Sequence, residues 1–266
     1  TDARIISKIE KPEALENADE ILDASDGIMV ARGDLGVELP AEQVPIAQTQ
    51  LIDLSRSKGK PVIVATQMLE SMITHSRPTR AEVTDVSHAV ERGADAIMLS
   101  GETAMGLFPE EAVRTMHRVA RQTEAYLWRD GVWGHGIDQT PNEALPVWNV
   151  IANAAAQISR QIMASGVMVV TKGGTSAATV STARPAAPIV AITSDMRALQ
   201  RMSLLWGVIP VMVPEAGKSN PNELARSTAE ALGLAEVNDS VVLVRGFNVD
   251  PELNTPSVTV INVRPH

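Results

Sequence analysis

The chain has 266 residues, enough for one large domain or two of medium size. Hydrophobic residues make up 44% and charged residues 21%, as in globular proteins with real cores, and the net charge of −9 argues against a nucleic-acid-binding surface. The absence of cysteine excludes disulfides, zinc–thiolate sites and thiol nucleophiles, and it fits a reducing cytoplasm.

The N-terminal residues and the apolar runs were checked for a signal peptide and for membrane-spanning segments. No apolar run approaches the roughly 20 residues that a membrane span needs, so we expect no membrane partner. Thr1 to Arg4 are neither a signal peptide nor an initiator methionine. We therefore expect the sequence to be cut from a longer one.

The first half alternates short apolar runs with longer amphipathic stretches. The expected strands are Arg4–Glu10, Gly27–Ala31, Pro61–Thr66 and Ala94–Leu99. Such short, nearly continuous apolar runs are typical of parallel strands buried on both faces. The expected helices are Pro12–Leu22, Val44–Ser57, Thr79–Glu91 and Pro109–Trp128. Four βα units in a row predict a parallel sheet with right-handed crossovers.

A stretch rich in glycine and proline follows and predicts a linker over residues 130–144, between domains at 1–129 and 145–266. The second domain again has an α/β pattern. Its expected elements are a helix to about Ala164, a helix near Asn222–Leu232, and strands near Gly166–Thr171, Ile189–Thr193, Val208–Val213, Ser240–Arg245 and Ser257–Val263.

Each strand of the first half ends in polar residues, where parallel α/β proteins collect their chemistry. Lys8 and Glu10 share one face of their strand, about 7 Å apart by strand rise. The other three strands end in Arg32-Gly33-Asp34-Leu35-Gly36, Thr66-Gln67 and Ser100-Gly101-Glu102-Thr103. The residue types predict reactive groups on a single rim.

These residue types suit a metal-assisted reaction. Glu10 and Asp34 suit Mg²⁺, which takes one or two carboxylates and leaves its other positions to water and substrate. Lys8 beside them would neutralise charge on a transferring phosphoryl group. Gly33 and Gly36 would let backbone N–H groups approach an anion at a helix start. Taken singly, these residues are more typical of surface ion pairs, turn glycines and helix caps, so the pattern alone indicates only a metal-assisted enzyme.

Five strings in this order resemble the pyruvate kinase family: Ile6 to Glu10, Gly27 to Gly36, Val64 to Met72, Arg77 to Glu82 and Ile97 to Ala104. The resemblance covers essentially the whole chain and is densest up to Trp128. It implies an α/β fold: the second half of a (β/α)8 TIM barrel, then an α/β domain with a mixed, mostly parallel sheet that serves regulation and oligomerisation.

The resemblance assigns roles by position. Lys8 matches the lysine that stabilises the transferring phosphoryl group, and Glu10 and Asp34 match the metal ligands. Gly33, Asp34 and Thr66 match the site that holds pyruvate or phosphoenolpyruvate. Ser100 is a weaker match, to a water-linked proton path. Arg32 and Glu102 resemble structural or interface partners more than groups that take part in the chemistry.

The implied activity is phosphoryl transfer from phosphoenolpyruvate to ADP, giving pyruvate and ATP in cytoplasmic glycolysis. The implied cofactors are Mg²⁺ or Mn²⁺, with K⁺ bound by residues outside this chain, and the implied assembly is a homotetramer. By alignment to the motifs, the phosphate-gripping arginine, the lid and the first barrel strands would precede Thr1. We therefore expect residues 1–266 alone to be inactive.

In the second domain, Thr171-Lys172-Gly173-Gly174-Thr175-Ser176 follows a strand and opens a helix. Such a loop is a reasonable phosphate cradle, and by resemblance it matches the binding loop for a sugar-phosphate or nucleotide effector. An ordinary glycine-rich turn is the alternative. By resemblance, the segment from Arg245 to Thr255 matches a later effector loop, and it keeps the Asn254-Thr255 pair but lacks the glycine-rich pattern expected upstream of that pair.

Three functional hypotheses remain open. The first is the catalytic and regulatory part of a pyruvate kinase. The second is a phosphometabolite-binding or assembly module of the same family without turnover. The third is another metal-dependent enzyme, such as a lyase of phosphoenolpyruvate or pyruvate, against which the uninterrupted motif strings argue.

Overall fold

The computed structural model describes residues 3–133, 146–246 and 255–263. The chain divides into two compact units, Thr1–Asp130 and Gly131–His266. Most of the predicted linker, 130–144, lies outside the described residues. No helix in the described ranges is long and apolar enough to cross a membrane.

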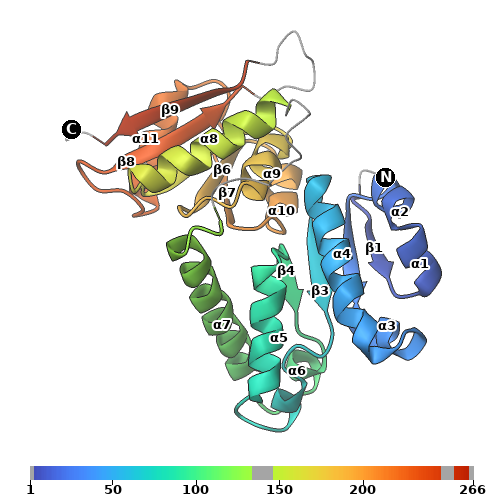
Figure 1. Ribbon diagram of the computed structural model, residues 1–266. Coiled ribbons are helices and arrows are strands. Elements are labelled where there is room, and N and C mark those ends of the chain that lie inside the picture. The colour runs from blue at the N-terminus through green and yellow to red at the C-terminus, as the bar shows by residue number, and fades with distance from the viewer. Residues whose placement is uncertain (1–2, 134–145, 247–254, 264–266) are drawn as a thin grey trace. The chain divides into compact units, whose positions relative to one another are not determined.

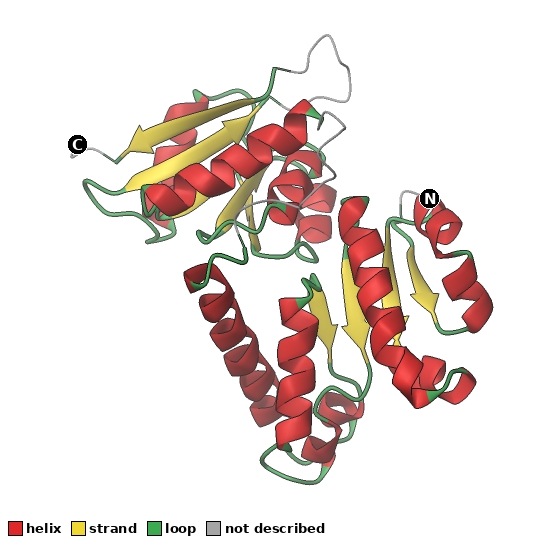
Figure 2. Ribbon diagram, in the orientation of Figure 1, coloured by secondary structure: helices red, strands yellow, loops and turns green. Residues whose placement is uncertain are grey.

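The first unit is built on a four-stranded parallel sheet whose spatial order, β1-β2-β3-β4, is also the chain order. Each βα unit therefore adds its strand at the same edge of the sheet, as a βα barrel requires. The strands are β1 (Ile6–Ile9), β2 (Gly27–Ala31), β3 (Val62–Ala65) and β4 (Ala96–Met98). The longer helices are α4 (Val44–Ser57), α5 (Arg80–Glu91) and α7 (Pro109–Arg129), seen in Figures 1 and 2.

The two faces of this sheet differ. Ile9, Val30 and Val64 are register partners, and they are buried in one core with apolar residues of α4, α5 and α7. The neighbouring row, Lys8 and Met29 with Ile63 and Ala96, lies on the opposite face and is only partly buried or exposed. The helices therefore cover one face, and Lys8 stands on the other.

Short helices fill the connections of the first unit. They are α1 (Pro12–Glu16), α2 (Ala18–Ala24), α3 (Arg32–Glu38), α6 (Gly101–Ala104) and the 3₁₀ turns η1 (Ala41–Gln43) and η2 (Glu70–Ile73). The single helix predicted over Pro12–Leu22 is wrong: it is broken at Asn17, whose side-chain amide donates to the carbonyl of Glu13. An asparagine that bonds the local backbone in this way competes with helix continuation.

The second unit is a five-stranded sheet in the order β7-β6-β5-β8-β9, parallel except for the antiparallel pair β8–β9. This confirms the mixed, mostly parallel sheet. Helix α11 packs on one face, against Met168 and Val190, and α8 and α9 pack on the other, against Val167 and Val169. The strands are β5 (Gly166–Val170), β6 (Ile189–Thr193), β7 (Val208–Met212), β8 (Ser240–Arg245) and β9 (Ser257–Asn262), and the helices are α8 (Val147–Gln161), α9 (Thr175–Thr182), α10 (Met196–Met202) and α11 (Pro221–Ala231).

Helix α10 was not predicted, although the sequence carries a signal for it. Asp195 caps the helix by accepting hydrogen bonds from the backbone N–H groups of Arg197 and Ala198. An aspartate directly before a short amphipathic run is a helix-start signal.

Candidate active site at the strand ends

Lys8 is held between two carboxylates at the carboxyl end of β1. Its Nζ lies 2.6 Å from Glu10 Oε2 and 2.7 Å from Asp34 Oδ2. Glu10 follows β1, and Asp34 lies in the first turn of α3, which begins directly after β2. Because β1 and β2 are parallel neighbours, their carboxyl ends meet at one edge and bring the three side chains together.

All three side chains are reachable from solvent, with exposed fractions of 50% for Lys8, 41% for Glu10 and 52% for Asp34. Hydrogen bonds to Asp34 and Glu10 hold the pKa of Lys8 above its ordinary value, so it is an ammonium ion at neutral pH. The site therefore presents one fixed positive charge and two carboxylates to a ligand.

The carboxylates of Glu10 and Asp34 are close enough to bind one cation, because both lie within 2.7 Å of the same atom, Lys8 Nζ. Among the described residues, no group of three or more His, Asp or Glu side chains could hold a metal. A site with two protein carboxylates suits Mg²⁺ or Mn²⁺, which then keep water and substrate oxygens as other ligands. Glu10 and Asp34 are thus compatible with the predicted metal.

Thr66, directly after β3, has a left-handed backbone with φ of 71°, and the next residue, Gln67, has φ of 54°. Two consecutive non-glycine residues in this region are strained, and such strain clusters at functional sites. The Thr66 hydroxyl accepts a hydrogen bond from the N–H of Gly33 at 2.7 Å and donates to the carbonyl of Ala65 at 2.6 Å. A Cβ at Gly33 would lie 3.3 Å from this hydroxyl, so only glycine allows the close approach without a shift.

Arg32 and Glu102 are buried and bond to neighbouring main chain, in keeping with the structural part expected of them. Arg32 donates to the carbonyl of Thr66 and, from Nη1, to both carboxylate oxygens of Asp85 at 2.6 Å. Asp85 was missed by the sequence analysis. Its place on α5 within an ordinary amphipathic pattern gave no signal.

Ser100 stands at the end of β4 and caps α6 without a side-chain bond. Within the described part of the chain its hydroxyl makes no hydrogen bond, while its backbone N–H donates to Glu102. The structure thus brings Lys8, Glu10 and Asp34 into contact, and Gly33 with Thr66, but it shows no bond from the Ser100 side chain to either group.

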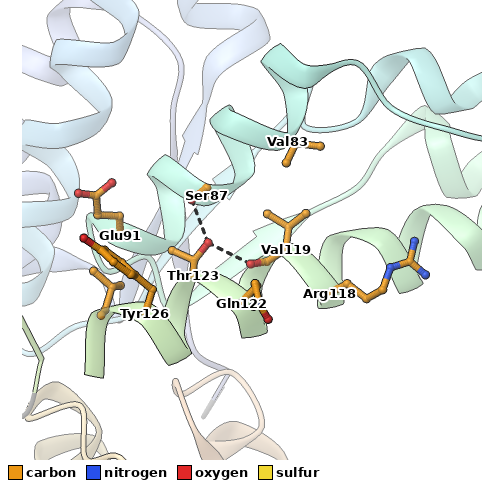
Figure 3. Close-up of a pocket in the computed structure, with 9 residues that line it drawn as sticks. Val83, Ser87, Glu91, Arg118, Val119, Gln122, Thr123 and Tyr126 are labelled. Atoms are coloured by element: carbon orange, nitrogen blue, oxygen red, sulfur yellow. Dashed lines mark hydrogen bonds between the residues drawn. The ribbon is translucent and has the colours of Figure 1, made fainter. Parts of the chain in front are cut away.

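Two of the cavities among the described residues of the first unit are of similar volume. One, of about 500 Å³, borders the strand-end site and is lined by Arg32, Gly33, Gly36, Gln67 and Asp85 among others. The other, of about 520 Å³, lies between α5 and α7 and contains no predicted site residue (Figure 3). Its walls include Ser87 and Thr123, whose hydroxyls are hydrogen-bonded at 2.9 Å.

In the second unit, the loop 171–176 joins β5 to α9. Gly174 precedes α9 with φ of 95°, a conformation that favours glycine, and its N–H donates to the Thr171 hydroxyl at 3.1 Å. Lys172, Gly173 and Thr175 are exposed, whereas the Thr171 and Ser176 side chains are buried. Lys172 and Thr175 are therefore the side chains that a ligand can reach.

The fold and the strand-end site define a parallel α/β protein of the barrel class, with charged groups gathered where the strands end. Comparison with known proteins narrows the class. Residues 1–113 match the family model described as pyruvate kinase, barrel domain, and residues 149–261 match pyruvate kinase, alpha/beta domain. The chain belongs to the pyruvate kinase family.

Individual relatives agree. The chain is 45% identical over 248 residues to a pyruvate kinase of Methylorubrum extorquens, covering 92% of this chain and 51% of the relative. It is 42% identical over 247 residues to that of Geobacillus stearothermophilus, covering 92% and 42%. A solved pyruvate kinase from Cryptosporidium parvum superposes with a TM-score of 0.86 at 37% identity, covering 98% of this chain and 51% of that one. The chain spans about half the length of the relatives it matches.

Proposed function

We propose that this chain carries phosphoryl-transfer residues of a pyruvate kinase, which moves a phosphoryl group from phosphoenolpyruvate to ADP and yields pyruvate and ATP. The observation that carries the proposal is the placement of Lys8 between Glu10 and Asp34 at the carboxyl end of a parallel sheet. The chain spans about half the length of its relatives. The activity is therefore a proposal, which this geometry and the family membership support.

The residues divide the work by charge. Lys8 places a positive charge beside the phosphoryl group. This charge stabilises the phosphoryl group while the bond from phosphorus to the enolate oxygen breaks and the bond from phosphorus to the ADP oxygen forms. Glu10 and Asp34 would hold the divalent cation, which supplies further positive charge to the phosphoryl oxygens when bound. Members of the family generally depend on Mg²⁺ and K⁺.

The carboxylate of the substrate needs a rigid binding site. We assign this binding to the backbone N–H groups of Gly33 and Asp34. Both lie in the first turn of α3, and the start of a helix favours anions. The Gly33 N–H donates to the Thr66 hydroxyl, which in turn donates to the Ala65 carbonyl, so a carboxylate bound here would take over or share these two donors. The enolate left after transfer then takes a proton at carbon, and we assign Ser100 to the water-linked path that delivers it.

The loop 171–176 is proposed as the site of a phosphorylated effector. The strand order reverses between β5 and β8, because the chain runs from β5 to β6 and β7 on one side and places β8 on the other. Ligands of open α/β sheets bind at such a switch point, outside the carboxyl ends of the strands. Lys172 and Thr175 are exposed there, beside the N-terminus of the eight-residue helix α9.

The domain roles and cellular setting follow as proposals. The first unit would be catalytic, and the second would serve regulation and assembly into a homotetramer. Strand β9 ends the described sheet with one strand neighbour, β8, and such an edge is available for pairing with another copy. The cysteine-free sequence fits a cytoplasmic location.

A coupled assay tests the proposed reaction on the native protein, meaning the protein as isolated from its own cells and not residues 1–266 expressed alone. Pyruvate formed from phosphoenolpyruvate and ADP is followed through NADH oxidation, with saturating Mg²⁺ and K⁺ and then with a chelator. We expect turnover of roughly 1–100 s⁻¹ that the chelator abolishes. Phosphoenolpyruvate binding without turnover would favour the binding module, and consumption of phosphoenolpyruvate without ADP would favour a lyase.

A further inference from the structure

Glu102 is a buried carboxylate that joins the ends of two neighbouring strands. Its side chain lies within α6, after β4, and the residue is only 2% exposed. Oε1 accepts a hydrogen bond from the backbone N–H of Leu69 at 3.1 Å, and Oε2 accepts one from the backbone N–H of Ser100 at 2.8 Å. One carboxylate thus ties the loop after β3 to the end of β4.

Glu102 is held by hydrogen bonds to the main chain. No ion pair involves Glu102 among the residues that the structure describes, and the side chains of its partner Leu69 and of the preceding Met68 are fully buried. Removing a carboxylate from water is costly, and breaking its hydrogen bonds leaves buried groups unpaired. An apolar side chain would avoid the desolvation of a carboxylate, but it would leave the N–H groups of Leu69 and Ser100 without their acceptor, so only a side chain with two acceptor atoms can hold both.

The loop tied by Glu102 is the one that carries Thr66. β3 and β4 are in register through Ala65 and Met98, so Thr66 and Ser100 leave the sheet at the same edge. The left-handed conformations of Thr66 and Gln67 persist only if the surrounding contacts determine the loop on both sides. Arg32 holds the loop at the Thr66 carbonyl, and Glu102 holds it three residues later at Leu69.

We propose that Glu102 is a positioning residue for phosphoryl transfer: its two hydrogen bonds fix the Thr66 hydroxyl and the Ser100 strand end relative to each other. It touches no substrate and acts through the backbone at Leu69 and Ser100. This inference rests on the proposed function, since it assigns Thr66 and Ser100 to the substrate and proton steps.

The test compares Glu102→Gln with Glu110→Gln in the native protein. The glutamine side chain in E102Q would keep one acceptor oxygen and turn an NH₂ group toward the other N–H. Glu110 is an exposed residue at the start of α7, so its substitution removes the same charge elsewhere. Hydrogen exchange is measured at the amides of Leu69 and Ser100. We expect exchange at one or both to be at least tenfold faster in E102Q and unchanged in E110Q.

Steady-state kinetics and Mn²⁺ titration of E102Q test the effect on function. A displacement of about 1 Å at a site can cost about 100-fold in rate, so kcat of E102Q should fall about 10- to 100-fold. Mn²⁺ affinity should stay within twofold, because Glu10 and Asp34 lie on other strand ends. Wild-type exchange rates at both amides in E102Q, or an unchanged kcat, would overturn the proposal.

Two further results separate the possible failures. If E102Q does not fold, Glu102→Asp replaces it, because the shorter carboxylate keeps its charge but reaches only one of the two N–H groups; unchanged exchange at both amides there would also refute the positioning role. If the wild-type protein has no turnover, the proposed function fails, while the exchange experiment still decides whether Glu102 holds the loop.

Discussion

Arg32 donates two hydrogen bonds to the carbonyl oxygen of Thr66, from Nε at 3.2 Å and from Nη2 at 2.5 Å. The residues are 34 apart in sequence, and the bonds cross from the start of α3 to the end of β3. Asp85, on α5, accepts from Nη1 with both carboxylate oxygens at 2.6 Å and thereby helps to orient the guanidinium, together with the side-chain oxygen of Gln48 at 3.4 Å. A helix outside the strand-end site therefore fixes the backbone of a proposed substrate residue.

Asp85→Asn should lower kcat about 10- to 100-fold by loosening this orientation, and it should destabilise the fold by about 1–3 kcal/mol through a weakened charged hydrogen bond. Steady-state kinetics and urea unfolding measure the two effects. Asp53→Asn is the matched control, since Asp53 pairs with Arg92 at an exposed surface. Equal kinetic losses in both variants would contradict the orienting role.

Glu10→Ala and Asp34→Ala should each weaken divalent-metal binding severely, by about tenfold or more, because each removes a charged ligand that water replaces poorly. Mn²⁺ titration followed by proton relaxation measures the affinity. Glu38→Ala, an exposed glutamate on the same helix as Asp34, should bind Mn²⁺ normally. Unchanged affinity in both site variants would remove these carboxylates from the metal site.

Lys8→Met should reduce kcat far more than it raises KM for phosphoenolpyruvate, because the ammonium favours the charge distribution of the transition state over that of bound substrate. A kcat loss of about 100-fold or more, with KM changed less than about fivefold, is the expected pattern. Lys11→Met serves as the control, as Lys11 is exposed just beyond the site. A loss confined to KM would assign Lys8 to ground-state binding.

The double variant Lys172→Ala with Thr175→Ala should abolish activation by a sugar phosphate or nucleotide while basal turnover stays nearly unchanged, because both side chains are exposed in the second unit. Calorimetry measures effector binding. Lys218→Ala removes an exposed lysine from the turn after β7 and should bind the effector normally. Equal effector affinity in all variants would sink the assignment. Ser176 is left intact because its side chain is buried.

Glu82 should make the fold sensitive to acid. Burial raises its pKa, but hydrogen bonds from Ser71 and Thr79 outweigh that effect and leave the pKa of Glu82 below its ordinary value. A lowered folded-state pKa means that its contribution is complete above the ordinary Glu pKa of about 4.3 and is lost as pH falls through the folded value.

Glu82→Gln should therefore cost about 1–2 kcal/mol of unfolding free energy at pH 7, where capping box and loop contacts are both weakened, and much less near pH 3. Denaturant unfolding across this range measures the difference. Glu110→Gln should show little difference at either pH. A constant cost for E82Q from pH 7 to pH 3 would show that ionisation of Glu82 is not the cause.

The sequence by itself determined the strands, most helices and the rim on which the polar residues gather. β2, α4, β6 and β8 begin and end where the apolar runs predicted, because periodicity and breaker residues are local properties. The contact of Lys8 with Glu10 and Asp34 was foreseeable as well, since parallel strands end at one edge and side chains two apart share a face.

Only the tertiary structure decided how the site is held. The left-handed backbone of Thr66, the burial of Arg32 and the bridge made by Glu102 involve bonds between residues far apart in sequence, such as Arg32 with Thr66, 34 positions apart, and Glu102 with Leu69, 33 positions apart. No local pattern records such pairs, because a buried arginine or glutamate has the same sequence signature as an exposed one. The choice between them is made by which neighbours the packed strands bring within hydrogen-bonding distance.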